Sequence, residues 1–308
     1  MSYILERAYA KINLHLDVER KTDDGYHDIY TLMQIVSLYD EVEIKLNMTK
    51  DISVKVLNAD INVPMRKNLA YIAAEKFYEN LSFEANGRAD ITITKKIPIA
   101  AGLGGGSADA AAVLRGLNNL YGKPYTIKQL CNIGMQIGSD VPFCIVGGVQ
   151  VCNKRGNIVI STFGIKYYRI LIAIGDEKES TADQYRKLDE KYNDFKDYKM
   201  SMGFTNSYVA FNSGRCREGF THMANIFESI YDEEASVHKI KKIMYDNGAR
   251  AALLSGSGPS VFGAFTNMLY LEDAQEALEK EGYKCYSCQP INTAYEDMSP
   301  DIEPWSDN

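Results

Sequence analysis

Four glycines and a serine stand directly in front of an alanine-rich stretch in this chain, in the segment Gly102-Leu103-Gly104-Gly105-Gly106-Ser107. Glycine lets backbone N–H groups approach an oxyanion closely and tolerates positive φ. The first turn of a helix leaves N–H groups unpaired and carries the positive end of the helix dipole. The combination predicts a phosphate-binding site, in which the Ser107 hydroxyl can reach a phosphate or its magnesium ion. A glycine-rich turn that merely connects a strand to a helix would need fewer glycines.

The motifs of the common nucleotide-binding folds do not fit this segment. The chain has no G-x-x-x-x-G-K-[ST] sequence, which excludes a Walker-type phosphate loop. Gly102 and Gly104 begin like G-x-G-x-x-G, but Ser107 occupies the place of the third glycine, so the dinucleotide interpretation is weak. We therefore expect a phosphate-binding loop of a different family.

Two further groups of residues have side chains suited to catalysis. Lys11 and Asn13 alternate in a strand-like stretch and project from one face of it, where a lysine is ordinarily a solvated edge residue. Asp140 follows a glycine and a serine, a position where an aspartate is usually a cap or a turn residue. Wedged between small and apolar neighbours, this carboxylate can instead be a buried base whose partner is a lysine.

Two loops have side chains or backbone suited to binding. Tyr26 and His27 follow the turn ending at Gly25 and supply a ring and an imidazole, which suits a nucleobase or sugar, although loop residues of this kind often only cover the surface. The small-residue segment 254–260 can let the backbone approach an anion, and it is equally well interpreted as a turn between strands or between a strand and a helix.

The composition is that of an ordinary globular protein. The chain has 308 residues, enough for two domains with cores of their own, and its formal net charge of −7 makes nucleic acid an unexpected partner. The six cysteines do not indicate a disulfide framework, and the lone pair Cys285 and Cys288 lacks the further ligands of a zinc site. We find neither a secretion signal nor a run of about 18 apolar residues, so we expect a cytoplasmic enzyme with no membrane partner.

Hydrophobic periodicity predicts the elements that must position these residues. The expected strands are 5–18, 28–37, 40–46, 52–57, 89–94, a pair within 147–160, 167–174, 251–254 and 260–265. The expected helices are 68–80, 107–121, 126–137, 180–191, 223–228, 235–247 and 272–281. This order favours an α+β fold over a doubly wound sheet. Residues 192–217 show no pattern that predicts an element, and an acidic tail closes the chain.

Taken together, the motifs are far more specific than any one of them. The segments AYAKINL at 8–14, DGYH at 24–27, GGGSADAA at 104–111 and IGSDVPF at 137–143, with the loop at 254–260, resemble the GHMP kinases. The resemblance is strongest to the members that phosphorylate the 2-hydroxyl of a cytidine-diphosphate-linked methylerythritol in the non-mevalonate isoprenoid pathway. It runs from about residue 5 to residue 290.

The resemblance implies a two-domain fold and an ATP-dependent reaction. An N-terminal, ribosomal-protein-S5-like domain would span 1–165, a C-terminal, ferredoxin-like domain 166–294, and the tail 295–308. The cofactors would be ATP and Mg²⁺, and the protein would be a monomer or weak homodimer acting on a small-molecule substrate. Another alcohol (homoserine, mevalonate or a sugar) is the alternative acceptor, and a non-catalytic ligand-binding member of the family is the third hypothesis.

The resemblance also assigns roles to individual residues. Catalysis would fall to Lys11 and Asp140, with Asp140 as base or orienting carboxylate. The ATP-binding residues would be Asn68, Lys96, Pro98, Gly102, Leu103, Gly104, Gly105, Gly106 and Ser107. The metal ligand would be Ser107. The acceptor would be bound by Asn13, Tyr26, His27, Asp140, Thr181 and Tyr185.

Overall fold

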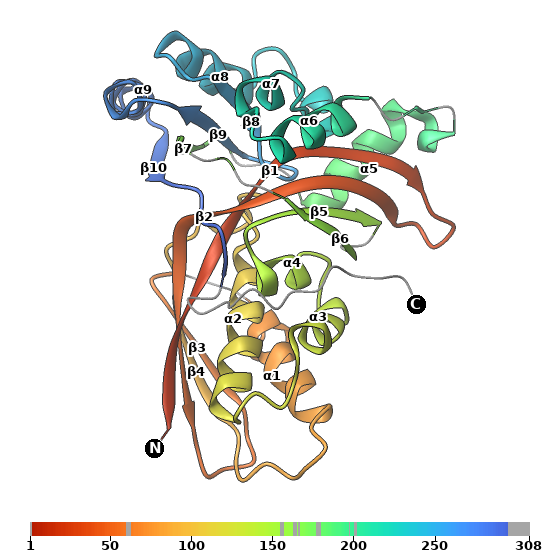
Figure 1. Ribbon diagram of the computed structural model, residues 1–308, viewed down its shortest axis with the longest axis vertical. Coiled ribbons are helices and arrows are strands. Elements are labelled where there is room, and N and C mark those ends of the chain that lie inside the picture. Colours follow the sequence, from red (N-terminus) through yellow and green to blue (C-terminus); the bar gives the residue numbers. More distant parts are fainter. Residues whose placement is uncertain are drawn as a thin grey trace.

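A long antiparallel strand pair runs through the whole molecule in the computed structural model. The structure describes residues 2–59, 63–154, 157–162, 165, 167–176, 180–196, 198–199 and 202–294. Strands β1 (Tyr3–Lys21) and β2 (His27–Leu46) pair along nearly all of their length, with register shifts near residues 10, 14 and 19. The turn predicted at 22–25 joins them. The curved pair sweeps from the lower to the upper half of Figure 1 and takes part in both halves of the fold.

The lower half is built on a six-stranded sheet. The order is β3-β4-β2-β5-β6, with β1 paired to β2. The bounds are β3 Ser53–Leu57, β4 Ala89–Thr94, β5 Val149–Lys154 and β6 Asn157–Thr162. The predicted break between residues 37 and 40 is wrong, because β2 continues as one strand: its first half pairs with β5 and its second half with β4. The alternation of apolar and polar residues is interrupted where β2 changes its partner strand from β5 to β4.

Four helices cover one face of this sheet (Figure 1). They are α1 (Leu69–Glu79), α2 (Gly105–Leu120), α3 (Ile127–Met135) and α4 (Val141–Val146). The small side chains of α2 let it lie close to the strands. The helix approaches β2 at Gly116, where an added Cβ would lie 2.5 Å from the Ile44 side chain. The Asn68 and Thr126 side chains cap α1 and α3, as expected of these residue types. Helix α4 was not predicted.

The upper half is a four-stranded antiparallel sheet in the order β10-β7-β9-β8. The strands are β7 (Arg169–Ile174), β8 (Ala251–Leu254), β9 (Ser260–Phe265) and β10 (Lys284–Cys288). Helices α8 (Ser236–Asp246) and α9 (Met268–Lys280) cover one face. The other face packs on the apolar side of β1, which places Phe262 in one cluster with Ile12 and Leu14.

The shorter helices between β7 and β8 complete the upper half. They are α5 (Thr181–Lys191), α6 (Gly203–Asn212) and α7 (Cys216–Thr221), with 3₁₀ helices η2 (Asn193–Phe195) and η3 (Ile226–Ile230). The helix predicted at 223–228 is corrected to η3, because Asn225 caps a tight turn that begins at the next residue. The segment that showed no pattern contains η2, α6 and α7, and β10 was also missed.

After β10 the chain returns to the lower half. The backbone of Ser37 donates to the carbonyl of Gln289 at 2.8 Å, and Ile291 donates to the carbonyl of Ile35 at 3.0 Å. Ala294 then donates to the carbonyl of Val146 at 3.3 Å. The first passage between the sheets lies between Thr162 and Arg169, so the sheets are tied together twice. The predicted tail 295–308 lies outside the described residues.

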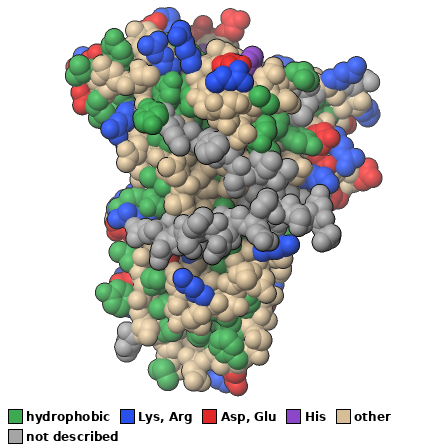
Figure 2. Space-filling view, in the orientation of Figure 1, with side chains coloured by type: hydrophobic (Ala, Val, Ile, Leu, Met, Phe, Trp, Pro, Cys, Tyr) green, Lys and Arg blue, Asp and Glu red, His purple; other side chains and the backbone are tan. Residues whose placement is uncertain are grey.

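Charged side chains of both signs are intermingled on the face shown in Figure 2, over the upper half in particular. Among the described residues, no helix combines the length and the apolar character that a membrane crossing requires.

Candidate active site

A cleft of about 720 Å³ lies where the two halves meet. It brings together residues from widely separated parts of the chain. Those predicted from the sequence that line it are Lys11, Asn13, Tyr26, His27, Gly102, Gly104, Ser107, Asp140, Thr181 and Tyr185. The predicted catalytic pair and the predicted acceptor-binding residues therefore share one cavity.

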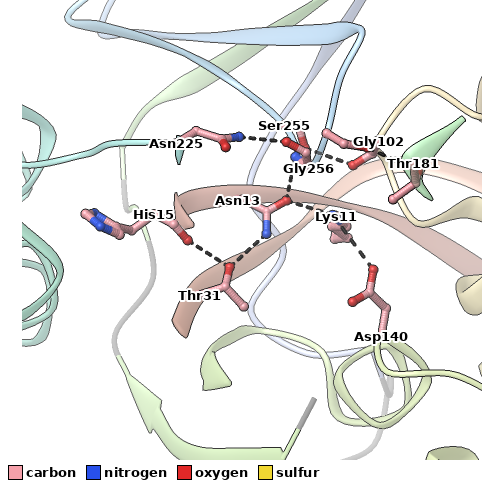
Figure 3. A network of polar contacts seen from close by, with 11 residues as sticks. Lys11, Asn13, His15, Thr31, Gly102, Asp140, Thr181, Asn225, Ser255 and Gly256 are labelled. Carbon is pink, nitrogen blue, oxygen red and sulfur yellow. Dashed lines mark hydrogen bonds and ion pairs between the residues drawn. The ribbon is translucent and has the colours of Figure 1, made fainter. Parts of the chain in front are cut away.

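The amine of Lys11 and the carboxylate of Asp140 meet in this cleft (Figure 3). Lys11 Nζ lies 3.8 Å from Asp140 Oδ2 and donates a hydrogen bond to Asn13 Oδ1 at 2.7 Å. Lys11 is buried, whereas about a third of the Asp140 side chain is exposed. The lysine is not a solvated edge residue, because the two glycine-rich loops lie against it at Gly104 and Gly256. The arrangement holds a cation beside a carboxylate that still faces the cavity.

Asn13 links the strand pair to the loop 255–259. Its Oδ1 accepts a hydrogen bond from the backbone N–H of Gly256 at 2.8 Å, and its Nδ2 donates to Thr31 Oγ1 at 2.8 Å. Thr31 in turn donates to the backbone carbonyl of His15 (Figure 3). The Asn13 amide is thus satisfied within the protein on both sides, and it fixes Lys11 relative to the loop.

The two glycine-rich loops lie directly against each other. Ser255 Oγ donates to the carbonyl of Gly102 at 3.1 Å, and the N–H of Ser260 donates to the carbonyl of Ala101 at 3.2 Å. Gly102 has φ +80°, and a Cβ there would lie 2.1 Å from the carbonyl oxygen of Ser255. Only glycine permits this approach. The segment 255–259 is a turn between β8 and β9, as the turn interpretation expects, and Gly256 and Ser257 line the cleft; its contact with an anion stays a prediction.

The glycines of the predicted phosphate loop lie at the start of α2. Gly104 precedes the helix with φ +71°, and a Cβ on it would lie 2.9 Å from Lys11 Cγ. The N–H of Lys11 donates to the carbonyl of Leu103 at 2.9 Å, which ties the loop to β1. Ser107, in the first turn, lines the cleft. The unpaired N–H groups of the helix start therefore lie near Lys11.

Behind this loop lies a buried ionic cluster that sequence reasoning missed. Lys95 Nζ donates to Asp40 Oδ2 at 2.5 Å and to Asp109 Oδ2 at 2.8 Å, and all three side chains are almost fully buried. Burial, followed by the nearby Asp40, raises the pKa of Asp109 to about 7, against the opposing effect of Lys95. Burial lowers the pKa of Lys95, but the nearby carboxylates of Asp109 and Asp40 outweigh this effect, so that the pKa of Lys95 is raised. Asp40 also accepts from the N–H groups of Lys96 and Ile97, so the cluster fixes both ends of the loop.

An aromatic wall forms the far side of the cleft. The His27 imidazole stacks on Tyr185, with ring centroids 4.5 Å apart and an angle of 19° between planes. His27 Nε2 lies 2.6 Å from Asp189 Oδ1. Tyr26 is largely exposed at the edge of the cleft, and Thr181 Oγ1 lies 3.2 Å from Ser257 Oγ. This wall presents flat, partly polar surfaces suited to a heteroaromatic ring.

Six predicted ATP-binding residues are not part of the cleft lining. They are Asn68, Lys96, Pro98, Leu103, Gly105 and Gly106. Asn68 accepts from the N–H of Ala70 as the cap of α1, and Lys96 Nζ pairs with Glu41 at 2.7 Å. Leu103 is buried. Contact of these residues with the nucleotide stays a prediction.

Sequence reasoning missed Asp189 and Asn225 as residues that support the site. Asp189 follows Tyr185 by one helical turn on α5, and this i, i+4 spacing places both on the same face of the helix. Asn225 Nδ2 donates to the carbonyls of Leu254 and Gly256, each at 2.8 Å. The spacing on α5 was a usable signal, whereas nothing in the sequence around Asn225 indicates its contact.

Known protein families match two parts of the chain. The GHMP kinases N terminal domain family matches residues 68–148, and the GHMP kinases C terminal family matches residues 218–284. The chain belongs to the GHMP kinases. Its sequence is 41% identical over 263 residues to a 4-diphosphocytidyl-2-C-methyl-D-erythritol kinase of Caldicellulosiruptor saccharolyticus, covering 85% of this chain and 88% of the relative. It is 36% identical over 280 residues to the enzyme of the same name of Clostridium tetani, covering 89% and 94%.

The solved structures agree with this placement. The crystal structure of a 4-(cytidine 5'-diphospho)-2C-methyl-D-erythritol kinase superposes with a TM-score of 0.72 at 26% identity, over 92% of this chain and 98% of that one. A homoserine kinase from Cytophaga hutchinsonii gives a TM-score of 0.75 at 19% identity, over 96% of both chains, which shows the shared fold. The two-domain GHMP kinase fold predicted from the motifs is confirmed, and the protein is a kinase.

Proposed function

We propose that this kinase transfers the γ-phosphoryl group of ATP to the tertiary 2-hydroxyl of 4-diphosphocytidyl-2-C-methyl-D-erythritol. The observation that carries the proposal is the single cleft in which Lys11 and Asp140 lie 3.8 Å apart, opposite the stacked rings of His27 and Tyr185. The names of the relatives support the same substrate. A small acceptor such as homoserine would have no use for the aromatic wall.

Asp140 has the position required of the group that orients the acceptor. Its carboxylate is partly exposed to the cleft and accepts a hydrogen bond from the acceptor hydroxyl. The hydroxyl oxygen bonds to the γ-phosphorus while the bond from that phosphorus to the β,γ-bridging oxygen breaks, and ADP leaves. The hydroxyl proton passes to Asp140 late in the transfer. Phosphoryl transfer depends mainly on positioning and charge neutralisation, which this arrangement supplies.

Lys11 supplies positive charge at the point of transfer. Its amine is anchored by Asn13 Oδ1 at 2.7 Å and lies 3.8 Å from the Asp140 carboxylate. The same charge stabilises the negative oxygens of the group in transit. A buried lysine held by two oxygen partners loses little freedom on binding substrate, so its contribution is preorganised.

The start of α2 is the proposed site for the ATP phosphates. The loop 102–107 presents backbone N–H groups and the Ser107 hydroxyl to the cleft, and the helix dipole adds positive potential. The loop 255–259 lies on the other side of the cleft from α2, and the hydrogen bond from Ser255 to the carbonyl of Gly102 fixes the two glycine loops relative to each other. In an acidic protein, these local groups concentrate the positive potential that a polyphosphate needs.

Mg²⁺ is the proposed metal cofactor, and the residues present suit it. Mg²⁺ prefers oxygen ligands and usually binds through one or two protein groups together with substrate phosphates. Ser107 and Asp140 provide a hydroxyl and a carboxylate in one cleft, although no cluster of three or more metal-binding side chains occurs within the described ranges. Ser107 would hold the ion, which would neutralise phosphate charge.

We infer a cytoplasmic monomer or weak homodimer that does not bind nucleic acid, which the net charge of −7 supports. Size-exclusion chromatography with light scattering tests the oligomeric state.

A substrate panel tests the proposed reaction. Purified protein is incubated with ATP, Mg²⁺ and one acceptor at a time, and ADP release is followed. We expect turnover with 4-diphosphocytidyl-2-C-methyl-D-erythritol and none with homoserine, mevalonate or galactose. Turnover with one of the other alcohols and none with the cytidylyl acceptor would overturn the proposal. Absence of turnover with every acceptor would favour the non-catalytic alternative.

A further inference from the structure

A chain of charged groups stands behind the aromatic wall of the cleft. Asp189 Oδ1 lies 2.6 Å from His27 Nε2, and Asp189 Oδ2 lies 2.8 Å from Lys21 Nζ. Lys21 Nζ also lies 2.7 Å from Asp194 Oδ1. The group joins the end of β1, the start of β2, α5 and η2.

Asp189 determines which nitrogen of His27 carries a proton. A carboxylate only accepts hydrogen bonds, so the imidazole nitrogen beside it must be the donor. Lys21 lies on the other oxygen of the same carboxylate, and the hydrogen bonds that it donates to Asp189 and then to Asp194 raise the pKa of Lys21 to about 12. With the proton on Nε2, a neutral His27 ring carries a lone pair on Nδ1.

The His27 ring is also held in orientation. It stacks on Tyr185 at 4.5 Å and meets Phe195 edge-on at 5.7 Å. Its side chain is nearly buried and lines the cleft. Among the described residues, the one hydrogen-bond partner of the ring is Asp189. The Nδ1 lone pair is therefore available to a ligand that enters the cleft.

We propose that Asp189 is a positioning residue that sets pyrimidine specificity: it holds the His27 proton on Nε2, so that Nδ1 accepts a hydrogen bond from an amino group on the base. This inference rests on the proposed function, in which cytosine lies at His27. Cytosine carries an amino group at the position where uracil carries a carbonyl oxygen. A uracil ring would set two acceptors against each other and leave both unpaired.

The Asp189→Asn variant tests the inference at constant size. An amide can either donate to the imidazole or accept from it, so the tautomer of His27 is no longer dictated. We compare kcat/KM for the cytidylyl acceptor and its uridylyl counterpart. The wild type is expected to prefer cytidine by about 10- to 100-fold, and the variant to lose about tenfold of that preference, with KM for ATP unchanged.

The chain offers a matched control on the same lysine. Asp194→Asn removes the other carboxylate from Lys21 but leaves His27 and Asp189 in contact. We expect it to keep the wild-type preference for cytidine. A loss of preference in this variant equal to that in Asp189→Asn would show that general disturbance of the wall is responsible, and would overturn the proposed role of Asp189.

A spectroscopic readout tests the tautomer without catalysis. ¹⁵N NMR of the ring nitrogens distinguishes a protonated from an unprotonated nitrogen, and the His27 signals are assigned by their disappearance in His27→Gln. We expect Nε2 protonated and Nδ1 unprotonated in the wild type, and a mixture in Asp189→Asn. A proton on Nδ1, or on both nitrogens, in the wild type would overturn the inference.

The outcomes separate this inference from the proposed function. Turnover of an unrelated alcohol and of neither pyrimidine acceptor would refute the proposed function and with it the specificity argument. Turnover of the cytidylyl acceptor, with equal use of the uridylyl one or with an unchanged preference in Asp189→Asn, would refute the role of Asp189 alone.

Discussion

Replacing Gly102 by alanine tests the contact between the two glycine loops. Gly102 has φ +80°, and the added Cβ would lie 2.1 Å from the carbonyl oxygen of Ser255. Gly122 has a similar φ of +76°, but no atom lies within 4 Å of the position of its Cβ. The pair Gly102→Ala and Gly122→Ala therefore has the same backbone strain and differs in the steric clash.

The structure sets the expected size of each effect. Left-handed backbone costs an alanine about 1–2 kcal/mol, which is the whole cost at Gly122. At Gly102 the loops must also separate until the 2.1 Å approach reaches ordinary contact at 3.4 Å or more. Overpacking of this kind costs about 1–3 kcal/mol, and loss of the Ser255 hydrogen bond costs about 1 kcal/mol more. We expect Gly102→Ala to lose about 3–6 kcal/mol of unfolding free energy in total.

Thermal unfolding and steady-state kinetics measure the two consequences. The midpoint should fall by about 4 °C in Gly122→Ala and by about 10 °C in Gly102→Ala. A displacement of about 1 Å beside the reacting groups should lower kcat/KM about 100-fold in Gly102→Ala, whereas Gly122→Ala should match the wild type. Equal midpoints and equal activities for the two variants would refute the contact between the loops.

Three more predictions concern single groups. Asp140→Asn should keep both ligands bound and lower kcat by about 10²–10⁴-fold, measured by single-turnover kinetics; near-normal turnover would remove Asp140 from its role. Burial lowers the pKa of His15 to about 4, offset in part by the backbone of His222. Below about pH 6.5 the unfolded chain therefore protonates His15 while the native state does not. The free energy of unfolding should fall by about 3 kcal/mol between about pH 6.5 and 4, and urea titrations at pH 7 and pH 4.5 should show that His15→Leu abolishes this loss. Lys95→Met leaves buried carboxylates unpaired and should cost about 3–5 kcal/mol of unfolding free energy, against under about 1 kcal/mol for the exposed Lys96→Met; equal losses would contradict the burial argument.

Much of the fold could be predicted from hydrophobic periodicity. β4 at Ala89–Thr94 and the helix α3 after Thr126 follow closely from alternation and from a capping residue. α6 was hidden because Gly203–Asn212 contains several poor helix formers. Its buried Phe204 and Phe211, two turns apart, hold it by packing, which local propensity does not report.

The site was less accessible to sequence reasoning taken residue by residue. Nothing in the spacing of Lys11 and Asp140 shows that they meet, because 128 intervening residues carry no information on their distance. Resemblance to known kinases supplied that pairing, and the 3.8 Å separation agrees with it. Burial of the polar face of β1 was also hidden: Asn13 accepts from the N–H of Gly256 and Asp17 accepts from the Tyr198 hydroxyl, and both partners are far away in the sequence.

The return of residues 289–294 to β2 has a mechanical consequence. The halves are joined by the passage between β6 and β7 and again by the backbone hydrogen bonds of Gln289, Ile291 and Ala294. Because the upper sheet also packs on β1, any movement that separates the halves must break these hydrogen bonds as well as side-chain packing. A domain-closure movement during turnover would have to preserve them, and cleavage of the chain after β10 would remove this restraint.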